Sequence, residues 1–560
     1  MRKTWRIKEP NPAAQEELAS SLKISKVMAQ LLINRGMPDA ASASDFMKSS
    51  LSSCHDPFLL KDMVKAVSRI KDAISRNEKI LVYGDYDVDG ITSVTIVYTA
   101  LKKLGASVES YIPNRVEEGY GLNLAAIKKA HRDGVTLIIT VDCGITSFKE
   151  VEYASSIGID VVVTDHHEVL LENIPKACAV IDPLQKDCQY PFKHLAGVGI
   201  AYKLVKALYD GTEFFAEDFL DLVSLGTVAD IAPLVGENRV LAKMGLAEMN
   251  KRERIGLNAL MDVGGLSGKE IISGHIGFIL GPRINAMGRI GSAKVSLDLL
   301  LSDNKEEAAR IAKLLDTENR VRQKIEAGIL EDALSKMERE VNFKHHKVIV
   351  LAGENWHPGV IGIVASRIAD RFYRPAILIS LAGKTAKGSG RSIDGFHLFE
   401  YLLRSKDTLM GFGGHESACG VTLEKDRVNE FRDRINEEAS KDVDDGIFSP
   451  KLDIDMDIPL SALTEKVISE IETLSPFGSD NPKPVLASRK LTVKDGPRQI
   501  GKNGFKVWVT DNRVTCEAVS FGKSNMEPPK LGSGVDLAYT PSINDWQGVQ
   551  SIQLELKDIA

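Results

Sequence analysis

Three short stretches of the sequence concentrate carboxylates and histidines. They are Gly84-Asp85-Tyr86-Asp87-Val88-Asp89-Gly90, Thr140-Val141-Asp142-Cys143-Gly144 and Thr164-Asp165-His166-His167. Aspartate and histidine side chains bind divalent metal ions, and a pair of such ions activates water and stabilises charge during phosphoryl transfer. Five carboxylates and two imidazoles brought together without a cation would repel and desolvate one another. The pattern therefore predicts a site for two divalent metal ions.

The elements that must position these residues can also be predicted. Each stretch follows a short apolar run rich in β-branched residues, at 79–83, 136–140 and 160–164. Such runs are typical of buried parallel strands, and helical patterns fill the intervals between them. The carboxyl ends of parallel strands lie along one edge of the sheet, where sites form. Asp230 also follows an apolar run and is a further candidate for this edge.

The spacing within the stretches favours metal ligands. Asp87 and Asp89 are one residue apart, and we expect a tight loop that ends at Gly90, where glycine permits a positive φ. Asp142 could bridge two ions because a carboxylate has two oxygens. The nitrogen of His166 among oxygen ligands favours Mn²⁺, Mg²⁺, Zn²⁺ or Fe²⁺ over Ca²⁺. Each aspartate alone could simply cap a helix, but four in order, one with adjacent histidines, favour a metal site.

Length and pattern predict an α/β multidomain protein, since 560 residues are too many for one core. With 43% hydrophobic and 26% charged residues the composition is that of soluble globular proteins, and the net charge of −6 excludes a globally basic nucleic-acid coat. The expected units are a helical N-terminal region (1–60), an α/β domain with a parallel sheet (61–303), a connecting helix (304–341), a smaller α/β domain (342–445) and a β-barrel or sandwich (446–560).

The connecting helix is predicted from composition. Residues 304–341 contain one glycine and no proline, and their apolar stripe consists of Ile311, Leu314, Leu315, Val321, Ile325, Ile329 and Leu330. A continuous helix of this length would span about 50 Å. It is too long for an ordinary packed helix, so we interpret it as a strut between two domains.

Targeting signals are not expected. The basic residues at the N-terminus have no apolar segment behind them, which predicts that no signal peptide is present. No apolar run approaches the roughly 20 residues that span a bilayer. The six cysteines are scattered, so we expect reduced, packed side chains. These features favour a soluble cytoplasmic protein without membrane contacts.

The three stretches together resemble the signature of the DHH phosphoesterase superfamily, and in particular its RecJ branch of single-stranded-DNA-specific 5′→3′ exonucleases. The resemblance covers about residues 60–560. Further segments that are similar to the RecJ branch are Leu225-Gly-Thr-Val-Ala-Asp230, Gly281-Pro-Arg-Ile-Asn-Ala-Met-Gly-Arg289, Trp356-His-Pro-Gly-Val-Ile-Gly-Ile-Val-Ala-Ser-Arg367, Ser389-Gly-Arg-Ser392 and Gly411-Phe-Gly-Gly-His-Glu-Ser-Ala-Cys-Gly420.

The resemblance implies a fold and a set of site residues. The fold would be a DHH catalytic domain and a DHHA1 domain joined by a long helix across a cleft, followed by an OB-fold barrel. Two divalent ions, Mn²⁺ or Mg²⁺, would be bound by Asp87, Asp89, Asp142, His166 and Asp230. Asp85, Asp142 and His167 would be the catalytic groups, with His167 beside the scissile phosphate. Tyr83 departs from the family, because many relatives have histidine there.

The substrate-binding residues are expected outside the metal site. Ser389-Gly390-Arg391-Ser392 offers a hydroxyl, backbone N–H groups and a guanidinium in one turn, which suits a phosphate. Further candidates are Arg115, Arg289, and the loop histidines His357 and His415. In the barrel, bases would stack on aromatic residues beside basic ones; the candidates are Trp508, Phe505, Trp546, Lys502, Lys506 and Arg513.

The resemblance implies metal-dependent, 5′→3′ hydrolysis of single-stranded DNA in repair and recombination, by a monomer. Single-strand-binding protein and a RecQ-type helicase would be natural partners. One alternative is a DHH-type phosphodiesterase for short oligonucleotides or cyclic dinucleotides, but such relatives lack the C-terminal barrel. Another is a non-catalytic DNA-binding replication scaffold, but such relatives have lost motif carboxylates that this chain retains. A pyrophosphatase is disfavoured by length and by the barrel.

Overall fold

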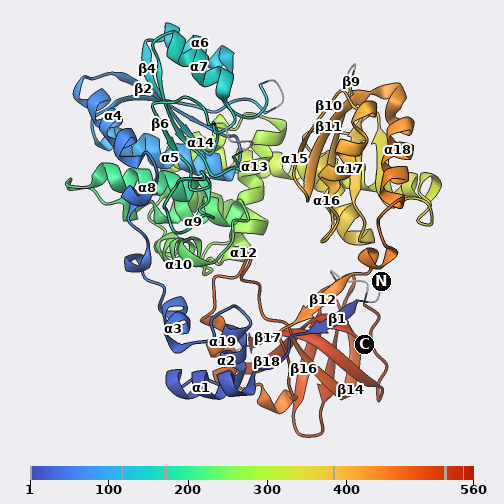
Figure 1. The fold of residues 1–560 in the computed structure, drawn as a ribbon. Coiled ribbons are helices and arrows are strands. Elements are labelled where there is room, and N and C mark those ends of the chain that lie inside the picture. The colour runs from blue at the N-terminus through green and yellow to red at the C-terminus, as the bar shows by residue number, and fades with distance from the viewer. Residues whose placement is uncertain (1–2, 116–117, 170–173, 383–384, 523–525, 547) are drawn as a thin grey trace.

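The computed structural model describes residues 3–115, 118–169, 174–382, 385–522, 526–546 and 548–560. The chain forms three lobes (Figure 1). Two α/β lobes lie side by side and are joined by one long helix, α15 (Lys305–Glu340). The third lobe lies below them and combines the first helices of the chain with the C-terminal strands. The α/β architecture, the joining helix and the terminal barrel that the sequence predicts are confirmed.

The first lobe is built on a parallel sheet with strand order β3-β2-β4-β5-β6. The strands are β2 (Lys79–Gly84), β3 (Ser107–Tyr111), β4 (Val135–Val141), β5 (Asp160–Thr164) and β6 (Ala179–Ile181). Strand β2 shows why the apolar runs are continuous. Ile80 and Val82 face one hydrophobic core and Leu81 and Tyr83 face the other, so both faces of the strand are buried.

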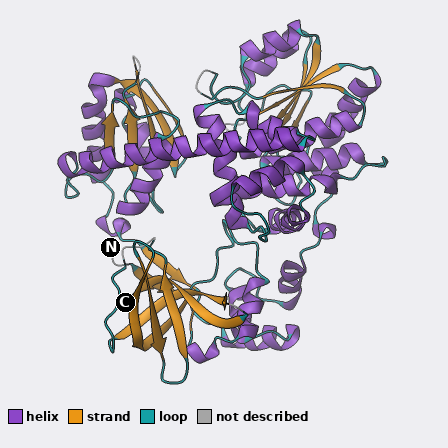
Figure 2. Ribbon diagram, turned by 180° about the vertical axis from the view of Figure 1, so that it is seen from behind, coloured by secondary structure: helices purple, strands orange, loops and turns teal. Residues whose placement is uncertain are grey.

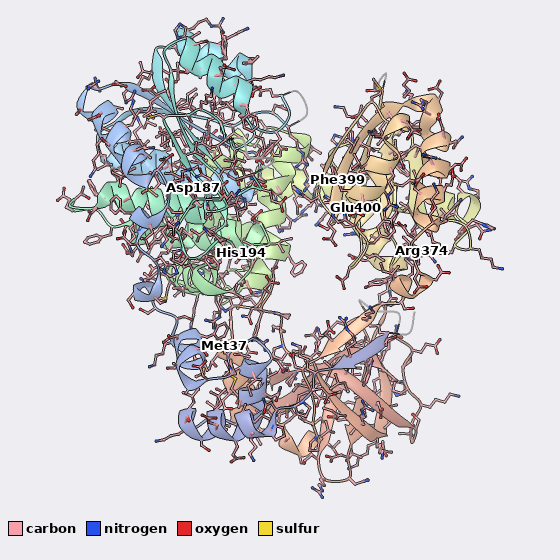
Figure 3. The ribbon with its side chains drawn as sticks, viewed as in Figure 1. Met37, Asp187, His194, Arg374, Phe399 and Glu400 are labelled. Carbon is pink, nitrogen blue, oxygen red and sulfur yellow. The ribbon has the colours of Figure 1, made fainter. Side chains whose placement is uncertain are left out.

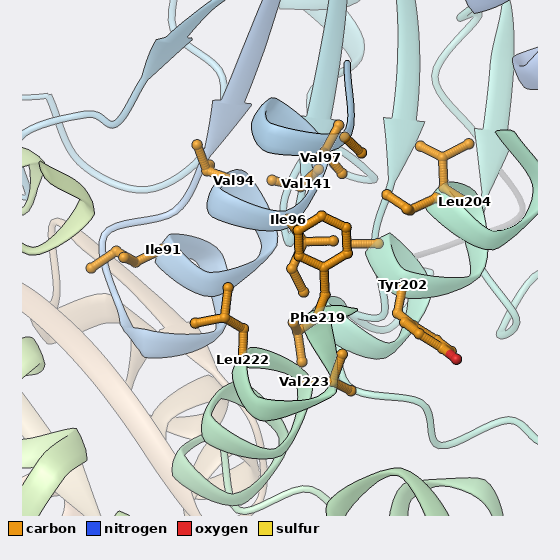
Figure 4. Packing of buried hydrophobic residues seen from close by; sticks show 14 of the residues in the cluster. Ile91, Val94, Ile96, Val97, Val141, Tyr202, Leu204, Phe219, Leu222 and Val223 are labelled. Carbon is orange, nitrogen blue, oxygen red and sulfur yellow. The ribbon is translucent and has the colours of Figure 1, made fainter. Parts of the chain in front are cut away.

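Helices cover both faces of this sheet. One face packs against α6 (Leu124–Arg132) and α7 (Phe148–Ser156). The other face packs against α4 (Met63–Ser75), α5 (Val88–Lys103), α8 (Gly197–Tyr209) and α9 (Leu220–Ala229). Figure 4 shows part of the second core, where Val94 and Val97 of α5 lie among Phe219, Leu222 and Val223. This packing fixes the start of α5 against the start of α8 and the end of α9.

The rest of the first lobe is helical. The chain continues through α10 (Gly236–Lys251), α11 (Ile255–Val263), α12 (Ser273–His275), the π-helical turn η4 (Ile276–Leu280), α13 (Gly281–Ile290) and α14 (Lys294–Leu301). Helices α11 and α13 contact the first half of α15. They therefore attach the long helix to the first lobe.

Helix α15 contains 36 residues and is about 54 Å long. Figure 2 shows it running from one α/β lobe to the other. Its N-terminus is capped by the side chain of Asn304, which accepts hydrogen bonds from two backbone amides. The predicted apolar stripe is only partly correct, because Leu314 and Val321 are 39% and 44% exposed. The middle of the helix instead buries polar residues, among them Arg322 and Glu326.

The second lobe has a mixed sheet with strand order β10-β11-β9-β8-β7. Its strands are β7 (Ile349–Gly353), β8 (Ala376–Ser380), β9 (Thr385–Arg391), β10 (Gly411–Gly414) and β11 (Ala418–Glu424). Helix α16 (Ile361–Phe372) and the second half of α15 cover one face, and α17 (Leu398–Arg404) and α18 (Val428–Ser440) cover the other. The joining helix is thus part of the core of this lobe.

The third lobe is a closed barrel with a helical cap. The barrel strands are β14 (Leu486–Ile500), β15 (Gly504–Thr510), β16 (Thr515–Ser520), β18 (Val549–Ile559) and β17 (Gly534–Trp546), and β17 pairs back with β14. The short strand β13 (Met456–Asp457) pairs with β14, and α19 (Glu465–Glu472) precedes the barrel. Helices α1 (Pro12–Leu22), α2 (Lys26–Ile33) and α3 (Ala40–Lys48) share one hydrophobic core with these elements.

The N-terminal region is not purely helical. Strand β1 (Thr4–Ile7) precedes the helices and pairs in parallel with β12 (Lys451–Ile454), just before the barrel. Residues 4–7 are therefore held by strand pairing against residues 451–454, which are more than 440 positions away in the sequence. Among the helices of the described ranges, none has a stretch long and apolar enough to cross a membrane.

One buried arginine joins the first and third lobes. Arg239 of α10 is 1% exposed, and its guanidinium donates to the carbonyl oxygens of Phe46 (2.6 Å), Ser475 (2.9 Å) and Thr473 (3.2 Å). It also lies 3.7 Å from the centroid of the Phe46 ring. Burial lowers the pKa of Arg239 to about 10. In Figure 3, Met37 and His194 mark where these two lobes approach each other.

We expect Arg239→Ala to lower the free energy of unfolding by roughly 3–5 kcal/mol, because several buried carbonyl oxygens lose their donor at once. Urea denaturation followed by circular dichroism measures the change. Arg320→Ala is the matched control, since that guanidinium is 75% exposed and its ion pair with Asp316 contributes little. A decrease in the free energy of unfolding below about 1 kcal/mol for Arg239→Ala would show that Arg239 does not stabilise the contact between the two lobes.

Candidate metal centre and phosphate pocket

The first aspartate cluster lies where β2 passes into α5. Asp87 is the N-cap of α5, and its Oδ1 accepts a hydrogen bond from Gly90 N at 3.1 Å. The expected loop is wrong, because Asp89 and Gly90 already belong to the first helical turn. Gly90 is not required for a positive φ either. A Cβ there would lie 2.5 Å from the carbonyl oxygen of Asp85, so glycine permits the close approach of the helix to the strand end.

Asp89 is buried and oriented by the start of a distant helix. Its side chain is 1% exposed and accepts hydrogen bonds from Gly197 N (2.8 Å) and Val198 N (2.7 Å), the first residues of α8. The N-terminus of a helix stabilises negative charge. Burial nevertheless raises the pKa of Asp89, and Asp87 adds to the rise. The carboxylate is therefore fixed in place but incompletely neutralised.

Asp142 occupies the centre of the cluster. It follows β4, is 2% exposed and has a left-handed φ of 59°. Its Oδ1 is buried without a hydrogen-bond donor and lies 3.1 Å from His166 Nε2. Burial and the neighbouring Asp89 raise the pKa of Asp142 well above its ordinary value. A Cβ on Gly197 would lie 2.7 Å from the same oxygen, so only glycine fits there.

The two histidines after β5 have different surroundings. His166 faces the carboxylates. Burial lowers its pKa, but the charges of the carboxylates, first Asp89 and then Asp230, outweigh burial, so the pKa is raised overall. His167 Nδ1 lies 2.7 Å from Asp165 Oδ1. Burial opposes the charged form of His167, but the bond to Asp165 raises its pKa to about 9.

Asp165 is a positioning residue that the sequence analysis did not assign. Its carboxylate accepts hydrogen bonds from Ile145 N (2.9 Å) and His166 N (2.8 Å), besides its contact with His167. These donors lower its pKa in spite of complete burial. Tyr120 also contacts His167, with 3.1 Å between its hydroxyl and Nδ1. The adjacency of Asp165 to His166 was a possible signal, whereas Tyr120 had none.

Asp230 reaches the cluster from a helix. The apolar run before it forms α9, so the expectation of a fourth strand end is wrong. Asp230 is the C-cap of that helix. Burial raises its pKa to about 7, and Asp89 contributes. Asp182, after β6, is a further buried carboxylate that was not predicted, and burial raises its pKa to about 7 as well.

The described residues provide three overlapping groups of metal-binding atoms. The groups are Asp85, Asp87 and Asp142; Asp89, His166 and Asp230; and Asp142, His166 and His167. Within each group the ligand atoms lie within 4.8 Å of one another. Asp85 Oδ1 is buried without a hydrogen-bond partner, and Asp142 Oδ1 is buried with only its contact to His166 Nε2, so both oxygens have lone pairs suited to a cation. The oxygen-rich donor set with one or two imidazoles fits Mn²⁺ or Mg²⁺.

Tyr83 belongs to none of these groups. Its hydroxyl donates to Gly121 O at 2.8 Å and accepts from Asn123 Nδ2 at 3.1 Å, inside the core on the α6 side of the sheet. The side chain therefore completes a buried hydrogen-bond network and leaves the carboxylates to form the site.

A cluster of guanidinium groups lies beside the carboxylates. Burial, together with the charges of Arg115, Arg322 and Arg391, lowers the pKa of Arg289 to about 10. Arg115 stacks on Tyr86, with 4.8 Å to the ring centroid. The four arginines come from the first lobe, from α15 and from the second lobe. Arg322 was not predicted, because its position on a long charged helix gives no local signal.

Strand β9 carries part of this pocket. Ser389, Gly390 and Arg391 lie within the strand, so the expected turn is wrong. Arg391 Nη1 donates to Gly390 O (2.7 Å) and lies 3.3 Å from Ser389 Oγ. Ser392 directs its hydroxyl to Phe396 O (2.7 Å), away from the arginines. The structure thus brings Arg391 and Ser389 together and separates Ser392 from them.

The remaining candidates lie apart from one another. Arg289 Nη1 donates to Gly359 O (3.1 Å), and His357 Nδ1 accepts from Gly359 N (3.1 Å), so His357 borders the pocket through one loop. Burial lowers the pKa of His357. His415, between β10 and β11, is exposed and lies 3.7 Å from Glu168 of the first lobe. Because Glu168 directly follows His167 in the chain, His415 of the second lobe contacts the first lobe beside the metal residues.

One of the aromatic residues predicted to bind bases lies on the outer face of the barrel. Trp508 points outward from β15 and is flanked by Arg498 and Lys506, at 4.7 and 5.0 Å from its ring. Phe505 is 5% exposed in the barrel core, so its predicted contact with a nucleic acid is wrong. The side chain of Trp546 lies outside the described set.

Comparison with known proteins defines the class. The model of the DHH family, N-terminal domain, matches residues 79–227, the DHHA1 domain model matches 345–441 and the RecJ OB domain model matches 454–558. The carboxylate cluster lies within or next to the first of these regions and the arginine pocket extends into the second. The fold and site are those of a DHH protein.

Full-length relatives narrow the class to one family. The chain is 40% identical to the single-stranded-DNA-specific exonuclease RecJ of Bacillus subtilis (strain 168), covering 99% of this chain and 70% of that protein. It is 35% identical to the RecJ of Escherichia coli (strain K12), covering 96% of each. The chain belongs to the RecJ family. Its fold matches the crystal structure of RecJ in complex with Mn²⁺ from Thermus thermophilus with a TM-score of 0.86 at 28% identity, over 100% of this chain and 80% of that one.

Gly197→Ala should weaken Mn²⁺ binding by about tenfold or more, because the new Cβ would displace Asp142, a shared member of two ligand groups. The increase in Tm caused by Mn²⁺ measures the effect. Gly199→Ala is the control on the same helix, since its Cβ would come closest to the end of the Leu195 side chain, at 3.2 Å, and would not touch a ligand residue. Equal Mn²⁺ responses in both variants would argue against a metal-binding role for Asp142.

Asp230→Asn should stabilise the metal-free protein at pH 8 by roughly 1–3 kcal/mol. The folded pKa of about 7 lies above the unfolded value of 3.8, so the folded state loses stability as pH rises through that interval. Asparagine removes this penalty, which is complete above pH 7 and absent near pH 4. Unfolding in EDTA at both pH values measures it, with the exposed Asp303→Asn as control. A variant that is no more stable at pH 8 would contradict the assigned burial cost.

Proposed function

We propose that the chain is a metal-dependent exonuclease that hydrolyses single-stranded DNA from its 5′ end. One observation carries the proposal: Asp142 and His166 each belong to two of the three ligand groups. Two ions could therefore be held by neighbouring sets of ligands, because Asp142 and His166 link the third group to the other two. The relatives named as single-stranded-DNA-specific exonucleases, and the Mn²⁺ and Mg²⁺ complexes of the Thermus thermophilus RecJ, support this assignment.

The ligand residues divide between two sites. We assign Asp85, Asp87 and Asp142 to one ion, and Asp89, His166 and Asp230 to the other. When bound, the ions acidify the attacking water and stabilise the charge that develops on the phosphoryl oxygens. The backbone amides that begin α8 hold Asp89 in its orientation. The raised carboxylate pKa values match a site that is completed by cations.

His167 supplies a positive charge next to the metal site. Its pKa of about 9 keeps the ring protonated at neutral pH. Nδ1 is occupied by Asp165, so Nε2 is the nitrogen that would donate to a phosphoryl oxygen. The hydrogen bond to His167, with the backbone amide of Ile145, lowers the pKa of Asp165 in spite of its burial, and Asp165 in turn keeps His167 in this orientation. The pair acts on the substrate without forming a covalent intermediate.

The arginine pocket would bind the 5′-terminal phosphate. Buried guanidinium groups repel one another, which lowers the pKa of Arg289, and an anion would relieve this repulsion. Arginine binds phosphate through paired N–H donors, and Ser389 adds a hydroxyl beside Arg391. A strand end fixed beside the metal residues would be cut one step from that end. The position of the pocket therefore supports both exonucleolytic cleavage and 5′→3′ polarity.

The barrel would bind the strand farther from the cut. Trp508 and its two cationic neighbours form a surface suited to base stacking and to the phosphate backbone. A role in repair and recombination, in the cytoplasm and as a monomer, belongs to the same proposal. Single-strand-binding protein and a RecQ-type helicase are the proposed partners, because the helicase produces single strands and the binding protein coats them.

Degradation of a 5′-phosphorylated single-stranded 40-mer, labelled at its 3′ end, tests the proposal. We expect shortening from the 5′ end with Mn²⁺, no reaction with EDTA, and no reaction on a blunt duplex. Asp142→Asn should reduce the rate by about 10³-fold or more with the fold intact, because it removes the shared ligand. Asp187→Asn, at an exposed ion pair with Lys61, is the matched control.

Two outcomes would contradict the proposal. Shortening from the 3′ end would exclude the assigned polarity. Hydrolysis of dinucleotides without cleavage of the 40-mer would assign the chain to phosphodiesterases of short substrates.

A further inference from the structure

Ile231, directly after Asp230, has an unfavourable backbone conformation. Its φ is 63°, and α9 ends there with Ile231 N donating to Val228 O (3.3 Å) and Ala232 N donating to Thr227 O (3.3 Å). This helix ending places its left-handed residue at a position where glycine is normally found. A β-branched residue is the least suited to it, because its Cβ crowds the backbone.

Burial does not offset that strain. Ile231 is 73% exposed, so its side chain gains little from the fold. Strained residues that contribute little to packing are found where function requires the side chain. The exposed side chain of Ile231 therefore calls for a partner outside the chain.

Phe278 is a second exposed apolar residue in the same region. It is 82% exposed and lies in η4, a π-helical turn, which is a rare conformation that often marks functional sites. Ile272, at the start of α12, is 45% exposed. Single exposed apolar residues are common, but these three lie on or beside α9, α12 and η4, and η4 contacts both α9 and α12.

The turn that carries Phe278 abuts the metal residues. Helix α9 and η4 are in contact. A Cβ on Gly281, just after η4, would lie 3.4 Å from Ala229 Cβ and 3.9 Å from Val88 Cγ2. Ala229 precedes Asp230, and Val88 lies between Asp87 and Asp89. The exposed apolar residues are thus on elements that meet at the metal centre.

The same surface borders the third lobe. Ser273 Oγ donates to Phe477 O (2.7 Å), and Leu234 N donates to Ser479 O (2.8 Å). Residues 477–479 lead into the first long strand of the barrel. A DNA strand held at once by the metal centre and by the barrel would pass over this part of the first lobe.

We propose that Ile231 and Phe278 form a base platform, a surface on which nucleobases next to the scissile phosphate pack. The inference rests on the proposed function and adds to it the way in which the strand is held for each cut. An aromatic ring and a branched aliphatic side chain bind the face of any base, so contact is independent of sequence. A protein partner fits less well, because the surface adjoins the residues that must receive the phosphate.

The test compares normal DNA with DNA that lacks one base. Abasic residues are placed one at a time through the first positions from the 5′ end of a single-stranded 40-mer, and the rate is measured with Mn²⁺. We expect the wild-type rate to fall by about tenfold at one or two positions, where a base would otherwise stack. Phe278→Ala and Ile231→Gly should lower the rate on normal DNA by a similar factor and remove the sensitivity to the abasic residue.

Two matched controls accompany these variants. Phe215→Ala removes another exposed phenylalanine, 66% exposed, on the far part of the same lobe. Lys23→Gly relieves the same left-handed strain at the end of α1, where φ is 56°. Both should behave as wild type on normal and abasic DNA. Ile231→Gly and Lys23→Gly should each raise Tm by about 2 °C, because both replace a strained residue with glycine.

The outcomes separate this inference from the proposed function. If the wild type degrades no single-stranded DNA, the proposed function fails. If it does, and Phe278→Ala and Ile231→Gly keep the wild-type ratio between normal and abasic DNA, the base platform is excluded. Because this is a ratio within each variant, a change in metal affinity or in the amount of folded protein cancels. Loss of the abasic effect in these two variants and not in the controls supports the platform.

Discussion

The crowding of buried carboxylates at one edge of the first sheet is the constraint on which the rest of the structure depends. Ionised side chains such as Asp89 and Asp142 repel one another, and burial makes their charge costly. The protein offsets part of the cost with backbone amides at the start of α8. Bound cations would offset the rest of this cost. The packing of α5, α8 and α9, and the glycine at position 197, follow from the need to bring these groups so close.

A second cluster, of opposite charge, adjoins the first. The arginines of the phosphate pocket are buried enough for their mutual repulsion to lower the pKa of Arg289. The two clusters offset each other only in part, since Arg115 lowers the pKa of Asp85 and Asp87 raises that of Arg289, yet both pKa values remain shifted by burial. In the proposed function, metal ions complete one cluster and a phosphate completes the other. The long helix matters here because it contributes Arg322 and holds the lobe that carries Arg391 in register with Arg289.

The sequence predicts the site best where the functional residues lie directly after the strands that position them. Three strands and the aspartates that follow them were predictable because β-branched runs and motif residues lie within a few positions of each other. The apolar run before Asp230 suggests a strand that ends at this residue, but in the structure it forms helix α9. A short apolar run is compatible with either structure. Ser389 to Arg391 suggest a turn because glycine and serine are common there, yet the close approach of strands explains the glycine.

Other parts of the site depend on contacts between distant segments. The amide of Gly197 reaches Asp89 across more than a hundred residues, and Arg322 joins the pocket from the middle of a charged helix. Neither pattern differs locally from an ordinary helix start or a solvated helix face. Phe505 was expected at the surface, but alternation along β15 shows that it faces inward while Trp508 faces outward. The strand was predictable, whereas the side of it that faces the core was not.

The pairing of β1 with β12, and the core that α1–α3 share with the barrel, bear on how the chain assembles during synthesis. The first helices emerge from the ribosome long before the strands that cover their apolar faces. Both α/β lobes can fold in that interval, since domains generally fold as units in the order of synthesis. The third lobe closes last and returns to the beginning of the chain. The barrel and its helical cap therefore close after both α/β lobes have been synthesised between them.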